Sequence, residues 1–253
     1  MVAGDAVAAM MHIHNGDVVA VLARRAQIPG EHFPFRESLI TGPVVDGEEW
    51  IETRTRALAA RYDEDHLRIR TELLEQDQAL AAAPAQGEIV LWFEHDLFCL
   101  VHLVHLLQRF ADARLTLIWC PTPLGMQEER EISLLFESRA AVMPSMIATA
   151  REVWRAYTSS DPAALNRWLE RETPDFPFLR EGLSLHASRF PSVRNGLGAI
   201  EQRALELIAA GTTDFAALFD RVNESARFGF GDSEVLGILK SMATRAVPLV
   251  TMA

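Results

Sequence analysis

The chain has 253 residues, of which 49% are hydrophobic, so it can bury a sizeable core in one large domain or in a main domain with an appendage. Its formal net charge of -11 excludes broad, nonspecific binding of nucleic acid or of an anionic membrane surface, because both need an excess of Lys and Arg. The apolar runs are too short to cross a bilayer, and the start shows no secretion signal, so we predict a cytoplasmic protein.

The first half of the chain alternates between strand and helix patterns. In chain order, we predict a strand at 10–15, a helix at 18–26, a strand at 31–39, helices at 48–62 and 65–83, a strand at 88–93, a helix at 97–110 and a strand at 114–120. Pro34 cannot donate to a ladder, which places the second strand at a sheet edge. This alternation predicts an α/β fold in which a Rossmann-like parallel sheet lies between two helical layers.

From Gly125 onward the strand patterns disappear and helical patterns dominate. The predicted helices lie at 144–157, 162–172, 181–190, 200–210, 214–222 and 233–243, followed by a short apolar stretch at 247–252. The last three helices and this stretch have the order of a small winged-helix-like unit. We therefore predict an α/β domain at 1–124, which carries the candidate cleft, and a helical domain at 125–253 with a winged-helix-like end.

Two polar motifs lie where buried strands should end. His-Ile-His-Asn-Gly-Asp occupies residues 12–17, and Trp-Phe-Glu-His-Asp occupies residues 92–96. If the first strand lies between the edge strand and the strand at 88–93, the crossovers leave on opposite faces of the sheet. The loops after the two central strands then open on one crevice, which is where ligands bind in such sheets. We predict a ligand cleft between these motifs.

Three ionisable residues in the second motif, Glu94, His95 and Asp96, would be costly to desolvate unless they are paired or used in function. Two carboxylates beside an imidazole suit general acid–base catalysis, and together with Asp17 they suit a divalent cation such as Mg2+ or Mn2+. We therefore predict catalytic roles for Glu94, His95 and Asp96, and metal ligation by Asp17, Glu94 and Asp96. In the structural alternative, Asp96 caps the next helix, Glu94 pairs with an arginine and His95 is solvated.

The turn after the first strand supplies further candidates. Asn15, Gly16 and Asp17 lead into a helix whose first N–H groups favour an anion, so we predict that they bind ligand. A simple helix cap by Asn15 or Asp17 is the alternative, and for Asp17 it is preferred. Glu37 follows Arg36 at the end of the edge strand, where it either joins the ligand site or forms only an ion pair.

A second polar segment breaks the helices at residues 190–197. Its Arg194 and Asn195 suit recognition of a phosphate or carboxylate, and we include them among the ligand-binding candidates. Helix capping and interdomain hydrogen bonds explain the segment equally well.

Two other pairs of residues favour structural roles. His102 and His105 share one stripe of the helix at 97–110, which we interpret as a solvated polar stripe rather than a metal site. Cys99 and Cys120 lie in apolar surroundings without zinc-site spacing, so we predict core thiols.

At these residues the chain resembles a bacterial family called the domain of unknown function 1835 family. The matching segments run through nearly the whole chain: residues 12–17, 28–31, 35–37 with Gly42-Pro43, 91–97 and 190–197. The resemblance implies that the following are motif positions: His12, Asn15, Asp17, Glu37, Glu94, His95, Asp96 and Arg194. It adds His12 to the candidate catalytic residues and is consistent with a winged-helix-like end.

Two functions from different classes fit these patterns. The first, which we prefer, is a metal-assisted hydrolase or group-transfer enzyme for a small phosphorylated or nucleotide-like ligand. The second is a regulatory protein that senses a ligand without turnover and contacts a protein partner through its helical tail. From residue 186 to 253 the chain carries seven basic and seven acidic residues, so DNA binding has only weak support.

Overall fold

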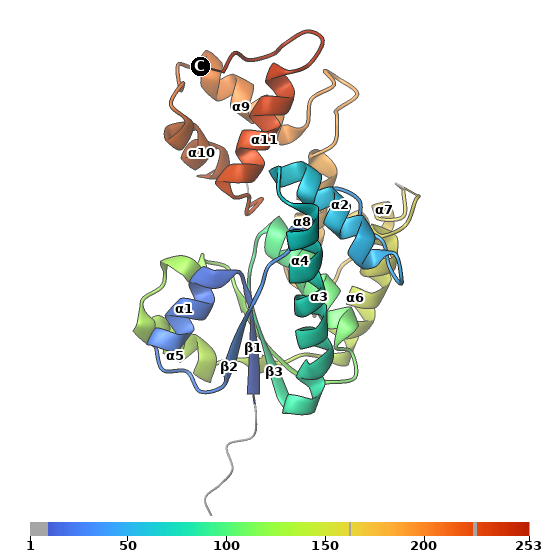
Figure 1. Ribbon diagram of the computed structural model, residues 1–253, viewed down its shortest axis with the longest axis vertical. Helices are drawn as coiled ribbons and strands as arrows, with labels where there is room; N and C mark the ends of the chain where they lie inside the picture. The colour runs from blue at the N-terminus through green and yellow to red at the C-terminus, as the bar shows by residue number, and fades with distance from the viewer. Residues whose placement is uncertain (1–9, 162, 225–226, 253) are drawn as a thin grey trace, which may run out of the picture.

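The computed structural model describes residues 10–161, 163–224 and 227–252. At its centre is a five-stranded sheet with the strand order β2-β1-β3-β4-β5 (Figure 1). The strands are β1 (Met10–Asn15), β2 (Glu31–Phe35), β3 (Glu88–Glu94), β4 (Arg114–Cys120) and β5 (Ala140–Ala141). The first four run parallel and β5 is antiparallel to β4, which confirms the predicted α/β class. The two exposed alanines of β5 carry no strand pattern, so this strand was not predicted.

Helices cover both faces of the sheet (Figure 1). One face is covered by α1 (Asp17–Arg25) and α5 (Glu129–Glu137), and the other by α3 (His66–Ala82), α4 (Leu97–Arg109) and α6 (Pro144–Tyr157). The remaining helices of this part are α2 (Trp50–Tyr62), α7 (Asn166–Glu170) and α8 (Leu179–Ser188). Because α6 and α8 pack on α4, the core continues across residue 124, where we predicted the boundary between two domains.

The strand order confirms the predicted neighbours of β1. The Pro34-containing strand β2 lies at the sheet edge on one side of β1, and β3 lies on the other. The crossover through α1 leaves on one face, and the crossover through α4 leaves on the opposite face. The carboxyl ends of β1, β2 and β3 therefore meet at one edge of the sheet, at a topological switch point.

His102 and His105 are 0% and 5% exposed, so the prediction of a solvated stripe on α4 is wrong. The sheet covers one side of α4. Helix α2 and the loop that follows β2 cover its polar stripe on the opposite side. The His105 ring stacks on Trp50 at 5.0 Å between centroids. Nε2 of His102 accepts from the N–H of Leu39 at 3.4 Å. Cys99 and Cys120 are buried free thiols, as predicted.

The structure differs from the predicted helices at two further places. The predicted helix at 162–172, whose first residue lies outside the described residues, is reduced to α7. The capped helix α5 was not predicted, although the Glu131 side chain accepts from the N–H of Glu128 at 2.6 Å at its start.

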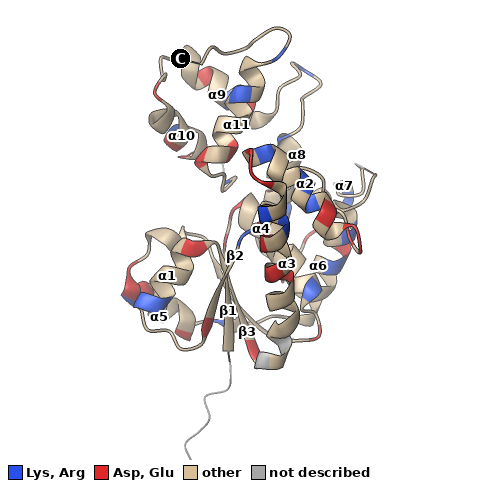
Figure 2. Cartoon of the chain, viewed as in Figure 1, with Lys and Arg blue, Asp and Glu red and all other residues tan. Residues whose placement is uncertain are grey.

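The chain ends in a small unit of three helices, α9 (Ala199–Ala209), α10 (Phe215–Glu224) and α11 (Asp232–Ala243), which lies beyond the carboxyl edge of the sheet (Figure 1). Acidic and basic residues are mixed over these helices (Figure 2). The helices of the expected winged-helix-like unit are present, but residues 199–224 and 227–252 contain no strand. Within the part of the chain that the structure describes, no helix is both long and apolar enough to span a membrane.

Candidate functional site

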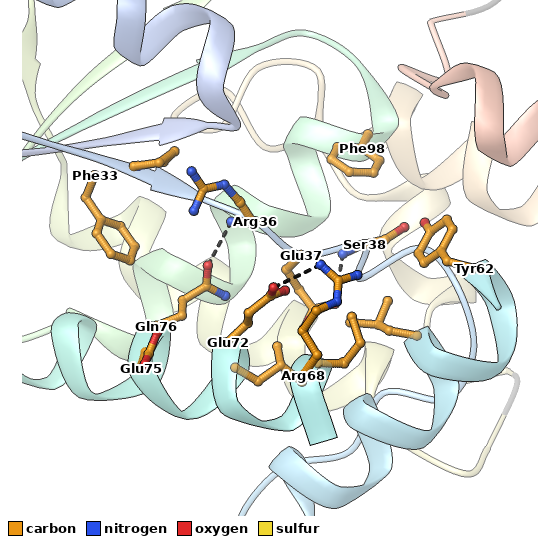
Figure 3. Close-up of a pocket in the computed structure, with 14 residues that line it drawn as sticks. Phe33, Arg36, Glu37, Ser38, Tyr62, Arg68, Glu72, Glu75, Gln76 and Phe98 are labelled. Carbon is orange, nitrogen blue, oxygen red and sulfur yellow. Dashed lines mark hydrogen bonds and ion pairs between the residues drawn. The ribbon is translucent and has the colours of Figure 1, made fainter. Parts of the chain in front are cut away.

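A pocket of about 710 Å3 opens beside the carboxyl end of β2 (Figure 3). Its volume lies within the range of small-molecule sites. The walls come from β2 and the loop after it, from α2 and α3, and from the first turn of α4. Aromatic, aliphatic and charged side chains line it together: Phe33, Pro34, Arg36, Glu37, Ser38, Leu58, Tyr62, Arg68, Ile69, Glu72, Leu73, Glu75, Gln76 and Phe98.

Two arginines, Arg36 and Arg68, line the pocket, and both are paired with exposed carboxylates. Arg36 holds Asp17 through two bonds, with Nε–Oδ2 at 2.9 Å and Nη2–Oδ1 at 2.6 Å, and this lowers the pKa of Asp17. Arg68 pairs with Glu64 and, at 3.1 Å, with Glu72. Because these side chains are 45% to 66% exposed, solvent screens each pair and the pairs contribute little to stability. An incoming anion can therefore replace a carboxylate at either guanidinium.

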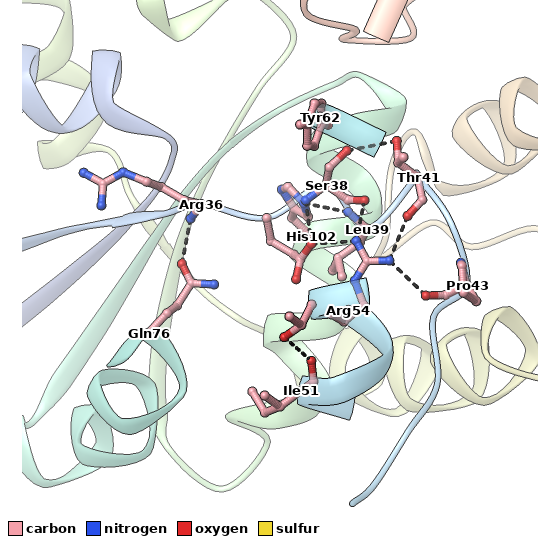
Figure 4. Close-up of polar contacts among 12 residues, drawn as sticks. Arg36, Ser38, Leu39, Thr41, Pro43, Ile51, Arg54, Tyr62, Gln76 and His102 are labelled. Atoms are coloured by element: carbon pink, nitrogen blue, oxygen red, sulfur yellow. Dashed lines mark hydrogen bonds and ion pairs between the residues drawn. The ribbon is translucent and has the colours of Figure 1, made fainter. Parts of the chain in front are cut away.

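The loop after β2, which forms one wall of the pocket, is anchored to α2 by the buried side chain of Arg54 (Figure 4). Arg54 of α2 donates to Glu37 Oε1 at 2.6 Å, and both side chains are fully buried. Its Nη1 donates to the carbonyls of Thr41 at 2.7 Å and Pro43 at 2.9 Å. The ion-pair interpretation of Glu37 is correct, although its partner is Arg54 rather than the adjacent Arg36.

Residues 15–17 of the first motif connect β1 to the neighbouring helices. Asn15 accepts from Nδ1 of His102 at 2.8 Å and donates to Cys99 Sγ at 2.9 Å, so its amide joins β1 to α4. Gly16 provides the turn into α1 with a φ of 84°, a conformation that favours glycine. Asp17 is the first residue of α1 and pairs with Arg36, so it does not cap the helix as the preferred alternative proposed.

The carboxylates of the second motif accept backbone hydrogen bonds. Asp96 Oδ1 accepts from the N–H of Cys99 at 2.7 Å and caps α4, as the structural alternative proposed. Burial raises the pKa of Asp96 to about 7. Glu94 accepts from the N–H of Leu124 at 2.8 Å rather than from an arginine, and burial raises its pKa as well.

The two candidate catalytic histidines lie away from the pocket. His95 packs between Trp119 and Phe178, with ring centroids 4.5 and 5.5 Å away, so it is not the solvated side chain of the alternative. His12 is fully buried on the α1 side of the sheet. Its Nδ1 accepts from Trp92 at 3.0 Å, so its Nε2 carries the proton and donates to the carbonyl of Pro29 at 2.9 Å. His12 is therefore a hydrogen-bonded core residue.

Arg194 and Asn195 line a different pocket, of about 530 Å3, beside the loop that follows α8. Asn195 donates to Gln202 at 2.6 Å and accepts from the N–H of Leu197 at 3.1 Å. The Asn195 amide thus forms hydrogen bonds within its own segment and to α9, which is the structural alternative given above. Neither residue shares a pocket wall with the site beside β2.

Among the predicted site residues, only Glu37 lines the pocket beside β2, and Asp17 reaches it through Arg36. Sequence reasoning missed Arg36, Arg68 and Tyr62 as site residues. The signal for Arg68 was present, because Arg68, Glu72 and Gln76 recur every four residues and so share one face of α3.

The three carboxylates proposed to hold a cation do not form one site. Asp17 is paired with Arg36, Asp96 caps α4, and Glu94 accepts from the backbone of the loop after β4. Throughout the described residues, no group of three His, Cys, Asp or Glu side chains is placed to hold a metal ion. The carboxylates therefore fit structural roles better than shared ligation of Mg2+ or Mn2+.

No family model matches the chain, and a search of curated proteins finds no match. Membership of the domain of unknown function 1835 family stays a prediction from the sequence motifs.

Substitutions of Asp96 test whether this carboxylate only caps α4 or also binds a metal ion. Asp96→Ala should be about 1 kcal/mol less stable than Asp96→Asn, because only alanine removes the acceptor that caps the helix. Asp96→Asn keeps the acceptor but cannot ionise, so it should be more stable than wild type above pH 7, where the buried wild-type carboxyl has to ionise. Thermal melts with and without Mg2+, Mn2+ and Zn2+ provide the measurement. A wild-type midpoint that rises with an ion, and a rise that Asp96→Ala abolishes, would restore the metal site.

Proposed function

We propose that this protein is a ligand-sensing protein that binds a small phosphorylated, nucleotide-like molecule in the pocket beside β2. One observation carries the proposal: two arginines with solvent-exposed ion-pair partners, Arg36 and Arg68, line the same ligand-sized pocket as aromatic side chains. Guanidinium groups bind phosphate oxygens in a planar, two-pronged geometry. The pocket lies at the edge of the sheet where ligands of open α/β folds bind.

The rest of the lining fits the ring of such a ligand. Phe33, Tyr62 and Phe98 offer flat apolar surfaces (Figure 3). Glu72 and Glu75 offer acceptors for ring N–H groups, while the charge of Glu37 is already neutralised by Arg54. A ligand with an anionic end and a hydrogen-bond-donating ring therefore matches both kinds of charge in the pocket.

Sensing is preferred over the hydrolase or group-transfer chemistry that the sequence favoured. That chemistry depended on Glu94, His95, Asp96 and His12, and these side chains cap a helix, accept backbone hydrogen bonds or pack in the core. They do not line the pocket in which we place the ligand.

Calorimetric titration with AMP, GMP, adenosine and inorganic phosphate tests the proposal. We expect a nucleotide to bind more tightly than adenosine or phosphate alone. Arg36→Ala and Arg68→Ala should each weaken nucleotide binding by about 10-fold or more, since a hydrogen bond to a charged group contributes roughly 1.5–3 kcal/mol. Arg56→Ala is the matched control, because Arg56 forms a similar exposed pair with Glu52 on α2 but does not line the pocket.

Two results would contradict the proposal. The first is a wild-type protein that binds none of the nucleotides at millimolar concentration. The second is an Arg56→Ala variant that loses as much affinity as the two pocket variants, because the loss would then follow from overall charge rather than from contact.

A further inference from the structure

The C-terminal unit holds three of the residues that line the pocket. The hydroxyls of Ser38 and Tyr62 both donate to the Glu234 carboxylate of α11, Ser38 at 3.1 Å. The backbone N–H of Phe98 donates to the carbonyl of Phe228 at 3.1 Å. Ser38, Tyr62 and Phe98 come from three different elements and lie on the same side of the pocket in Figure 3.

Glu234 is the centre of this contact. It is 6% exposed, although it lies on the first turn of a helix in the small C-terminal unit. Besides the two hydroxyls, Thr41 and Arg61 donate to its Oε2, each at 3.1 Å. Burial alone would raise its pKa, but the hydrogen bond from Tyr62 and the charge of Arg61 lower the pKa of Glu234, so it is a carboxylate. Four donors from the α/β part of the chain thus surround one buried negative charge of the C-terminal unit.

The segment before α11 forms a second contact, at the start of α4. The N–H of Leu97 donates to the carbonyl of Arg227 at 2.8 Å, next to the bond between Phe98 and Phe228. Gly229 has a φ of 68°, and a Cβ at this position would overlap the carboxylate of Asp96. The backbone therefore lies directly against the helix start, and only glycine leaves enough space.

We propose that α11 and the segment before it position one wall of the ligand site, with Glu234 as the positioning residue for Ser38 and Tyr62. This inference rests on the proposed function for the identity of the ligand. Because docking of the unit orders one wall of the pocket, a ligand that contacts this wall also favours docking. The two equilibria are then reciprocally linked, as any two coupled binding events must be.

The expected loss of order follows from the groups that bond to Glu234. Without its carboxylate, the Ser38 and Tyr62 hydroxyls lose their acceptor and Arg61 loses its counter-charge. Burial raises the pKa of Tyr62 to about 12, so its hydroxyl stays protonated and needs an acceptor at all ordinary pH values. The wall then samples disordered conformations, and ligand affinity falls in proportion to the fraction of protein in which it is ordered.

Gly229→Ala tests the inference without changing any residue of the pocket. We expect hydrogen exchange of the Leu97 and Phe98 amides and of the loop at 36–41 to become about 10-fold faster without ligand, and AMP affinity to fall about 10-fold. Gly211→Ala is the matched control, because Gly211 also has a positive φ, 95°, in the C-terminal unit but no atom within 4 Å of the added Cβ. It should leave the exchange of the pocket wall and the affinity for AMP unchanged.

A second pair of variants changes the charge instead of the backbone. Glu234→Gln should accelerate exchange in the same loop, whereas Asp220→Asn, at an exposed carboxylate of α10, should not. The inference is overturned if Gly229→Ala and Glu234→Gln accelerate exchange of α11 while the loop at 36–41 exchanges at the wild-type rate. It is also overturned if neither variant changes exchange at Leu97 and Phe98.

Hydrogen exchange without ligand tests the role of the C-terminal unit, and the AMP titration tests the proposed function, so the failure of one can be told from the failure of the other. If wild-type protein binds no nucleotide but both variants loosen the loop, the proposed ligand is wrong and the wall assignment holds. If wild-type protein binds AMP and both variants bind it equally tightly, the proposed function holds and the inference is wrong.

Discussion

Replacement of Arg54 by alanine is expected to lower the free energy of unfolding by about 3–5 kcal/mol, the largest effect expected of a single substitution behind the pocket wall. The variant leaves the carboxylate of Glu37 buried without a counter-charge, because both side chains are fully buried in the wild type. It also removes the donors to the carbonyls of Ser38, Thr41 and Pro43. The loop after β2 then loses the contacts that hold it against α2.

Urea denaturation of Arg54→Ala and of Arg56→Ala provides the measurement. Arg56 lies two residues away on the same helix, but its pair with Glu52 is 71% and 50% exposed, so this control should change stability by only about 0.5 kcal/mol. Similar losses in both variants would show that the buried pair has no special role. A stable Arg54→Ala variant with normal nucleotide affinity would show that the loop does not depend on Arg54.

Acidification from pH 6.5 to about 4.5 is expected to destabilise the protein by several kcal/mol. Burial lowers the pKa of His12 and His186 to about 4 and that of His105 to about 3. In the unfolded chain these groups titrate near 6.5, so in this window the unfolded state binds more protons than the folded state. Their stabilisation is therefore complete above pH 6.5 and is lost as the pH falls, by roughly 1.4 kcal/mol per histidine and pH unit.

Asp96 has the opposite effect and does not reverse the trend. Its pKa is raised to about 7, so the folded state binds the proton more tightly and stability from this group is lost as the pH rises toward 7. Glu94, whose pKa burial also raises, acts in the same direction as Asp96. Burial lowers the pKa values of His14 and His102 as well as those of the three histidines above, so the net stability still falls on acidification.

Urea denaturation at half-unit steps from pH 7.5 to 4.5 measures this dependence. His105→Phe should flatten the curve, because phenylalanine fills the aromatic space beside Trp50 and Trp154 without a titrating group. His66→Gln is the control, since the His66 side chain is 46% exposed. A stability that does not change with pH over this range, or equal flattening in both variants, would contradict the expectation.

The amino-acid sequence by itself determined the positions of the main elements. Apolar runs mark the buried strands, helical periodicity marks many helices, and proline marks several of their ends, so β1, β4 and α6 were predicted with their observed bounds. Pro34 alone placed β2 at the edge. These features are local, because each depends on residues within a few positions of one another.

Only the tertiary structure decided which polar side chains meet. Glu37 was recognised as a candidate, but its partner Arg54 lies 17 residues later in the chain, and no local pattern selects it over the adjacent Arg36. The burial of His102 and His105 depended on the loop and helices that cover α4. The bond from Ser38 to Glu234 spans 196 residues. A buried charge is matched by whichever donors the packing of distant elements brings within about 3 Å, and that distance is a property of the folded chain rather than of any segment.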